Sequence, residues 1–90
     1  MWTIYEKKSV SKVLDKMPLA IKKHYEIWKQ LVELSGPQSL RNVKGYHDEG
    51  LKGKWMGCRS SRLSLQWRVI YKVLAKECEV YVIEVNPHDY

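Results

Sequence analysis

The stretch that decides the fold runs from residue 45 to residue 71 and reads GYHDEGLKGKWMGCRSSRLSLQWRVIY. Its second half alternates polar and apolar side chains on either side of residues 64–66, which is typical of two strands joined by a turn. We therefore predict a β-hairpin with strands over residues 55–64 and 67–74. The second strand has one apolar and one more basic face, with Trp67, Val69, Tyr71 and Val73 against Arg68, Ile70 and Lys72.

Two helices are expected before the hairpin. The clearer one covers residues 19–35, because apolar side chains recur there at helical spacing. It ends at Gly36-Pro37, a pair that favours the end of a helix. A shorter helix is predicted between Ser9, as its N-terminal cap, and Pro18, which interrupts it and can begin the next helix.

Two further strands complete the predicted sheet. Residues 2–6 alternate large and polar groups, and residues 80–85 are nearly all β-branched, so we expect the latter to be a central strand buried on both faces. Residues 38–50 have no clean period and are expected to form a loop that has room for one helical turn. The chain therefore reads as one α+β domain, β-α-α-β-β-β, with both N-terminal helices on one face of a largely antiparallel sheet.

The charge of the chain points to an anionic partner. Ninety residues carry a formal net charge of +6, and a small basic domain attracts polyanions, of which nucleic acid is the commonest. An acidic protein partner, or no such partner at all, fits the charge as well. No segment approaches the ~20 apolar residues of a membrane span, and the N-terminus lacks a signal-peptide layout, so we expect a cytoplasmic protein.

We expect neither a metal centre nor a cofactor. Cys58 and Cys78 stand far apart with no cysteine or histidine at metal-ligand spacing, and two packing residues are favoured over a disulfide. His24 lies at the edge of the apolar stripe of its helix, where a structural histidine is favoured over a catalytic one. Phosphate-binding GxxxxGK[ST] and GxGxxG motifs are absent, as are HExxH and GxSxG.

The predicted turn places Arg62 opposite Arg68 on one side of the hairpin. Two adjacent guanidinium groups repel, so either an anion or acidic partner lies between them or both extend into solvent. Both interpretations stand at this point. A register shift of one residue would also move one of the two side chains to the other face.

Several groups that could act on a phosphate ester surround this pair. Lys52 and Lys54 flank Gly53 in a loop, where lysines can contact a phosphate backbone. Residues 47–49 are His-Asp-Glu, and residues 88–90 are His-Asp-Tyr, which adds groups able to transfer protons or stack on a base. The alternatives are a solvated basic loop, a polar surface run and a frayed C-terminal end.

Taken together, these residues resemble the RelE/HigB-like toxins of bacterial type II toxin–antitoxin systems. The similarity covers nearly the whole chain and includes a GxRSxRLSxxWRxIY pattern at residues 57–71, followed by an apolar strand and a C-terminal histidine and tyrosine. It implies a RelE-like microbial RNase fold and a metal-independent endonuclease that cuts mRNA in the ribosomal A site, where ribosomal RNA is also contacted. It also implies a cognate antitoxin protein that silences the toxin.

The resemblance also implies roles for individual residues. Glu49 matches an acid or base just before the LKG segment, and Arg68 matches the arginine that contacts the scissile phosphate. His88 and Tyr90 match C-terminal positions used for proton transfer and stacking. The division of acid and base roles between Glu49 and His88 stays open, and His47 is interpreted as structural.

Four cations are expected to bind the substrate: Arg59 and Arg62 as supporting arginines, and Lys52 and Lys54 as contacts to RNA. Two alternatives belong to other classes of function. ParE-like proteins share the fold and inhibit DNA gyrase without cutting RNA, and a plain RNA-binding module would use the same basic surface. Retention of the proton-transfer residues favours the nuclease.

Overall fold

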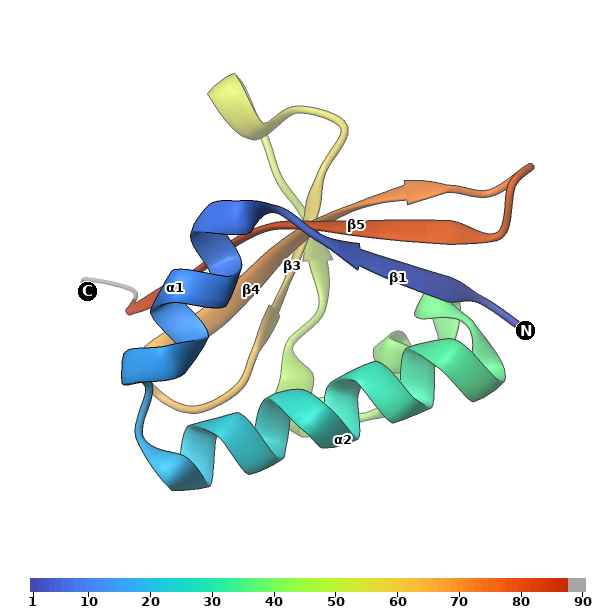
Figure 1. Cartoon of the computed structure of the whole chain (residues 1–90). Helices are drawn as coiled ribbons and strands as arrows, with labels where there is room; N and C mark the ends of the chain where they lie inside the picture. The colour runs from blue at the N-terminus through green and yellow to red at the C-terminus, as the bar shows by residue number, and fades with distance from the viewer. Residues whose placement is uncertain (88–90) are drawn as a thin grey trace.

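The computed structural model describes residues 1–87 as a five-stranded sheet with helices on one face (Figure 1). The order of strands across the sheet is β1-β5-β4-β3-β2; β1 pairs in parallel with β5, and the other neighbours pair antiparallel. The strands are β1 (Thr3–Glu6), β2 (Glu49–Gly50), β3 (Arg59–Arg62), β4 (Trp67–Leu74) and β5 (Glu79–Pro87). The helices are α1 (Lys8–Lys16) and α2 (Leu19–Ser35), with short 3₁₀ turns η1 (Pro37–Asn42), η2 (Lys44–Tyr46) and η3 (Gly53–Trp55).

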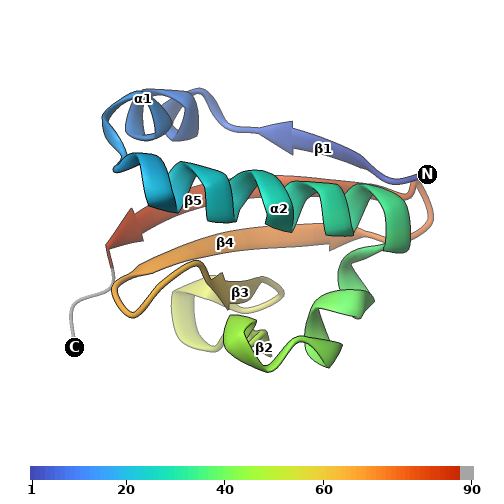
Figure 2. The same ribbon diagram turned by 90° about the horizontal axis from the view of Figure 1, so that it is seen from below.

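The core lies between the sheet and the helices. Figure 2 shows α2 running across the face formed by β4 and β5. The apolar stripe of α2 supplies Tyr25, Trp28 and Val32, all buried, and the ring of Trp28 meets that of Tyr71 edge to face at 5.3 Å. Burial of these large side chains, at roughly 1.5–3 kcal/mol each, is the main attraction between the two layers. Val10 of α1 joins the same core beside β5.

The predicted α+β fold is confirmed, and the bounds of α2 and β4 agree with the sequence prediction. The first helix begins earlier than predicted, after Lys7 and not at Ser9, and no side chain caps it. The predicted strand over residues 55–64 was too long, because η3 and Gly57, at φ +91°, interrupt the extended backbone before β3. The predicted loop over residues 38–50 contains η1 and η2 and ends in β2, which was not predicted.

The prediction that the last strand is buried on both faces was wrong. In β5, Val80 and Val82 are buried, but Tyr81 between them is 39% exposed and stacks on Tyr5 of β1. The reason is that the helices cover only one face of the sheet, so β-branched content alone does not reveal whether the other face is covered. The cysteines are free thiols, and Cys78 is exposed in a turn at φ +52°, so it is not a packing residue.

Neither of the two α-helices within residues 1–87 is long and apolar enough to cross a membrane. The described residues also contain no group of three or more histidine, cysteine, aspartate or glutamate side chains that could hold a metal ion.

Candidate functional site

The strand register brings two arginines together on the face of the sheet opposite the helices. Arg62 of β3 pairs with Arg68 of β4, and Arg68 pairs on its other side with Asn86 of β5. Directly opposed residues of antiparallel strands point to the same side. Because Val69 and Tyr71 point into the helix-covered core, Arg68 points away from it. The predicted juxtaposition of Arg62 and Arg68 is confirmed, and we call this surface the open face.

Glu49 belongs to the neighbouring row of the open face. It pairs with Ser60, which pairs with Ile70, which in turn pairs with Glu84 across the sheet. Glu49 is exposed, whereas Ser60 and Ile70 are buried. Residues two apart along a strand lie about 7 Å apart, so Glu49 and Arg62 are diagonal neighbours within reach of one small group. Two carboxylates, those of Glu49 and Glu84, and two guanidinium groups therefore share this face.

Arg68 carries an unsatisfied hydrogen-bond donor. Its Nε is buried without a partner, and no hydrogen bond or ion pair joins this guanidinium to another side chain within residues 1–87. A buried donor left unpaired is costly, so an oxygen acceptor from a ligand would be favoured there. Beside it, Asn86 donates from Nδ2 to Oε2 of Glu84 at 2.6 Å, which leaves the amide oxygen of Asn86 directed away from that carboxylate.

The two predicted lysines lie in the segment between β2 and β3, which stands away from the sheet on the side opposite α2 (Figure 1). Lys52 and Lys54 are both exposed, and Nζ of Lys54 lies 5.4 Å from the centre of the Trp55 ring. An exposed lysine over an aromatic ring gains about 0.5–1 kcal/mol. The pair adds positive charge beside the row that contains Glu49.

His88 and Tyr90, the two predicted C-terminal catalytic residues, lie outside the described residues. The described part of β5 ends at Pro87, opposite Trp67 and one position beyond Asn86 in the row of Arg68.

Arg59 lies on the other face of the sheet, away from Arg62 and Arg68. It pairs with Tyr71 on the helix-covered side, and its Nε and Nη2 each lie 2.8 Å from Oδ1 of Asp48. Arg59 was predicted to bind substrate with the other arginines. A spacing of three residues puts Arg59 and Arg62 on opposite faces of a strand, and this geometry makes Arg59 part of the scaffold.

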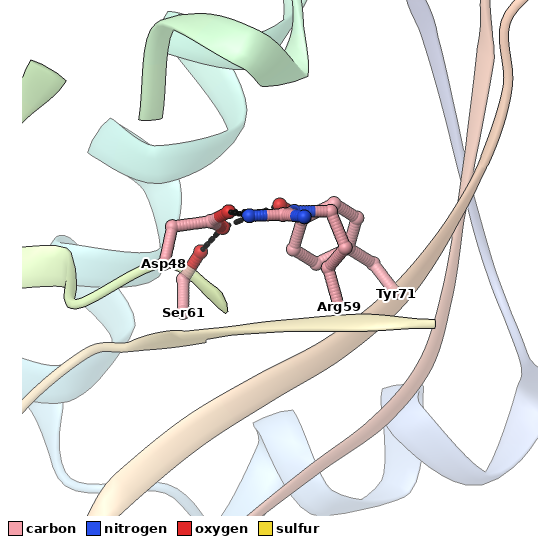
Figure 3. A network of polar contacts seen from close by, with 4 residues as sticks. All are labelled: Asp48, Arg59, Ser61 and Tyr71. Atoms are coloured by element: carbon pink, nitrogen blue, oxygen red, sulfur yellow. Dashed lines mark hydrogen bonds and ion pairs between the residues drawn. The ribbon is translucent and has the colours of Figure 1, made fainter. Parts of the chain in front are cut away.

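Asp48 is the centre of the contacts that hold Arg59 (Figure 3). Its side chain is 0% exposed and accepts hydrogen bonds from Arg59, from Ser61 Oγ at 2.6 Å and from the hydroxyl of Tyr71. The donors come from β3 and β4, so one carboxylate joins the segment before β2 to both strands that carry the arginine pair. We call these four residues the Asp48 network.

Burial and charge set the protonation states of Tyr71 and Arg59 in the Asp48 network. Burial raises the pKa of Tyr71 well above its ordinary value, Asp48 raises it further, and Arg59 opposes this in part. Burial alone would lower the pKa of Arg59, but the hydrogen bond and charge of Asp48 outweigh it and the pKa rises. Tyr71 therefore stays a neutral donor and Arg59 a cation near neutral pH.

The two described histidines have structural positions. Nδ1 of His24 on α2 lies 2.7 Å from the carbonyl oxygen of Leu63, which joins the helix to the end of β3. His47 adopts left-handed backbone angles at φ +43°, directly before Asp48. Its turn leads the chain into β2, in agreement with the interpretation of His47 as structural.

Sequence reasoning missed β2 and the Asp48 network. It treated residues 47–49 as one run of proton-transfer groups, yet neighbouring residues at the start of a strand point to opposite faces. Asp48 points into the core side and Glu49 to the open face. That alternation was the available signal, although the partners of Asp48 lie 11–23 residues further along the chain.

Comparisons with known proteins place the fold. No protein-family model matches the chain, and no curated protein matches it either. Among solved structures, the archaeal RelE–RelB complex from Pyrococcus horikoshii OT3 contains a chain with a TM-score of 0.77 at 22% identity, covering 96% of this chain and 93% of that one. The chain has the RelE-like fold.

Two further structures with the RelE-like fold support this assignment. The YoeB/ParE toxin from Agrobacterium tumefaciens matches with a TM-score of 0.73 at 15% identity, covering 97% of this chain and 99% of that one. The E. coli DinJ–YafQ toxin–antitoxin complex contains a match with a TM-score of 0.66 at 27% identity, covering 97% and 92%. The structural neighbours of this chain are therefore toxins of the RelE/ParE superfamily, as its sequence pattern predicted.

Proposed function

We propose that this protein is the toxin of a type II toxin–antitoxin system and a ribosome-dependent endoribonuclease that cuts mRNA in the A site. The observation that carries the proposal is the open face, where Glu49, Arg62 and Arg68 gather and the Nε of Arg68 has no partner within residues 1–87. An arginine guanidinium group can donate two parallel hydrogen bonds to phosphate oxygens, and a nearby carboxylate supplies a group for proton transfer. The likeness of the fold to that of solved toxins supports the same reading.

The reaction needs no group beyond those of the chain and the RNA. A base removes the proton of the ribose 2′-hydroxyl, O2′ attacks the adjacent phosphorus, and the bond to the 5′-oxygen of the next nucleotide breaks. An acid gives a proton to that leaving oxygen. Glu49 takes one of these roles and His88 the other, while Tyr90 stacks on a base. The products carry a 2′,3′-cyclic phosphate and a 5′-hydroxyl.

The cations supply the stabilisation of charge. Negative charge grows on the phosphate oxygens as O2′ attacks, and preorganised donors aimed at it are commonly the largest contribution to catalysis. Arg68 contacts the scissile phosphate and Arg62 supports it from the neighbouring strand. Lys52 and Lys54 bind the RNA backbone from the segment that follows β2 and also give long-range attraction to ribosomal RNA.

A cognate antitoxin is the expected protein partner. The structures of RelE with RelB and of YafQ with DinJ are complexes with such partners. For this chain we propose an acidic antitoxin segment that covers Arg62 and Arg68; Arg59 is already held by Asp48 and is left out. An apolar cavity of about 250 Å³ beside Arg62, bordered by Ile27 and Tyr46, offers room for an apolar side chain of that segment.

The test is cleavage of messenger on translating ribosomes, with the cut sites and the ends of the products mapped. We expect cuts in the A site with 5′-hydroxyl ends, unaffected when excess chelator is added briefly to ribosomes already equilibrated with magnesium. Arg68→Ala serves as the inactive control. Intact messenger together with inhibited gyrase supercoiling would instead establish the ParE-like alternative, and 5′-phosphate ends would exclude attack by the 2′-hydroxyl.

A further inference from the structure

We propose that Asp48 is a positioning residue that holds Glu49 in place on the open face. The inference rests on the proposed function, because it assigns Asp48 a purpose through Glu49. Its starting point is the small size of β2, which consists only of Glu49 and Gly50 and forms the edge of the sheet. A two-residue edge strand has few ladder hydrogen bonds, so something else must fix its position.

The side chain of Asp48 supplies that attachment. On the C-terminal side of β2, the amide of Leu51 donates to the carbonyl of Cys58 at 2.9 Å. On the N-terminal side, His47 turns in the left-handed region and Asp48 enters the sheet as a fully buried carboxylate. A buried carboxylate that accepts bonds from a cation and two hydroxyl groups is tightly localised.

The contacts of Asp48 also fix Glu49 relative to the arginine pair. Two donors to Asp48, Arg59 and Ser61, alternate along β3 with Ser60 and Arg62, which face the other way. The third donor is Tyr71 of β4, three residues beyond Arg68. Strands β3 and β4 therefore hydrogen-bond to Asp48 on one face of the sheet and carry Arg62 and Arg68 on the other. Glu49 directly follows Asp48 in the chain. A displacement of Asp48 moves Glu49 against its partners in the reaction.

A role in stability alone would explain a buried network equally well, and a double-mutant cycle separates the two roles. The variants are Asp48→Asn, Glu49→Gln and the double substitution, with kcat measured on saturating ribosomes at a temperature where each is folded. A misplacement of about 1 Å can cost about 10²-fold in rate. We expect Asp48→Asn to lower kcat at least about 10-fold with Glu49 present, and less than about 3-fold in the Glu49→Gln background.

Equal losses in both backgrounds would overturn the proposal, because a residue that only stabilises the fold acts independently of Glu49. An unchanged kcat in Glu49→Gln would overturn it too, since Asp48 would then have no catalytic group to position. If Asp48→Asn does not fold, Ser61→Ala removes a single donor and enters the same cycle in its place.

The chain offers a matched control for the loss of a buried tyrosine hydroxyl. Tyr25 also lies in the core, packs on Trp28 and donates to a carboxylate, that of Glu6, but it is remote from β2. Tyr71→Phe should lower kcat through Asp48, whereas Tyr25→Phe should lower stability and leave kcat unchanged. Equal kcat for the two variants at equal folded fraction would contradict the positioning role.

A measurement without substrate keeps this inference separate from the proposed function. The amide of Leu51 reports the attachment of β2, and Asp48→Asn should speed its hydrogen exchange at least about 10-fold while amides at the centre of β4 change little. If the wild-type protein cuts no messenger, the proposed function fails even if this exchange effect is seen. If the wild-type protein cuts messenger, but Asp48→Asn changes neither the exchange of the Leu51 amide nor the kcat values of the double-mutant cycle, the positioning role is refuted and the proposed function stands.

Discussion

Replacing Arg59 by methionine should destabilise the fold far more than the same replacement of Arg68. Arg59 places two nitrogens 2.8 Å from the buried carboxylate of Asp48, whereas Arg68 has no hydrogen-bond partner within the described residues. Removing one partner of a fully buried ion pair costs about 3–5 kcal/mol. The side chain of Arg59 is 26% exposed, which weakens the pair, so we expect a loss of about 2–4 kcal/mol.

For a domain of this size, that loss corresponds to a fall of at least about 8 °C in Tm. The assay is thermal melting and urea unfolding of the wild type, Arg59→Met and Arg68→Met, with messenger cleavage measured on the same samples. Arg68→Met should lower the free energy of unfolding by no more than about 0.5 kcal/mol, because the buried Nε of Arg68 has no partner to lose, and it should abolish cleavage. If Arg59→Met melts like the wild type, Arg59 does not support the fold through Asp48, and its assignment to the scaffold is wrong.

Three further outcomes are expected. Deleting residues 88–90 should change stability by no more than about 0.5 kcal/mol and lower cleavage at least about 10²-fold, and a truncated protein that cuts at the wild-type rate would remove His88 and Tyr90 from the proposed mechanism. Ile27→Asp should weaken antitoxin binding, measured by calorimetry, and leave cleavage intact. An unchanged affinity would show that the antitoxin does not use the cavity beside Arg62. Burial, and then Asp48, raise the pKa of Tyr71 in the folded protein. The neutral hydroxyl of Tyr71 therefore contributes fully to the free energy of unfolding below the unfolded pKa of about 10, and this contribution is lost as the pH rises through the higher folded pKa. Urea unfolding between pH 8 and pH 11 should therefore show a shallower alkaline loss of stability in Tyr71→Phe than in the wild type.

The parts of the fold that could be predicted from sequence are those with strong local patterns. Helix α2 has an uninterrupted apolar stripe and a Gly-Pro stop, and β4 alternates over its whole length, so both had clear bounds. The opposition of Arg62 and Arg68 followed from the position of the turn between two strands. These features need only the residues of one helix or one hairpin, which is why they were visible without the structure.

The parts that sequence did not predict depend on distant contacts. Strand β2 is too short to have a period, and the residue before it, Asp48, finds its partners on β3 and β4, far along the chain. Whether the second face of β5 is covered depends on the placement of the helices, which no pattern within the strand reports. The position of Arg59 is a different case, since strand parity alone separates it from Arg62. Grouping arginines by their chemistry, without regard to parity, led to the wrong neighbourhood for Arg59.

Successive residues of β3 point to opposite faces of the sheet, so structural and proposed catalytic side chains alternate along the strand. Along β3, Arg59 and Ser61 face the core and hold Asp48, while Ser60 and Arg62 face the open side. Substitution of Arg59 or Ser61 should therefore lower the free energy of unfolding, and cleavage with it through the loss of a donor to Asp48, whereas substitution of Arg62 should lower cleavage with little change in stability. Catalysis by positioned groups requires the reacting atoms to be held within a fraction of about 1 Å. The buried carboxylate of Asp48 fixes β3 on its helix-covered face, and the same strand presents Arg62 on its open face. We therefore expect the Asp48 network to hold the arginine pair in position for the reaction.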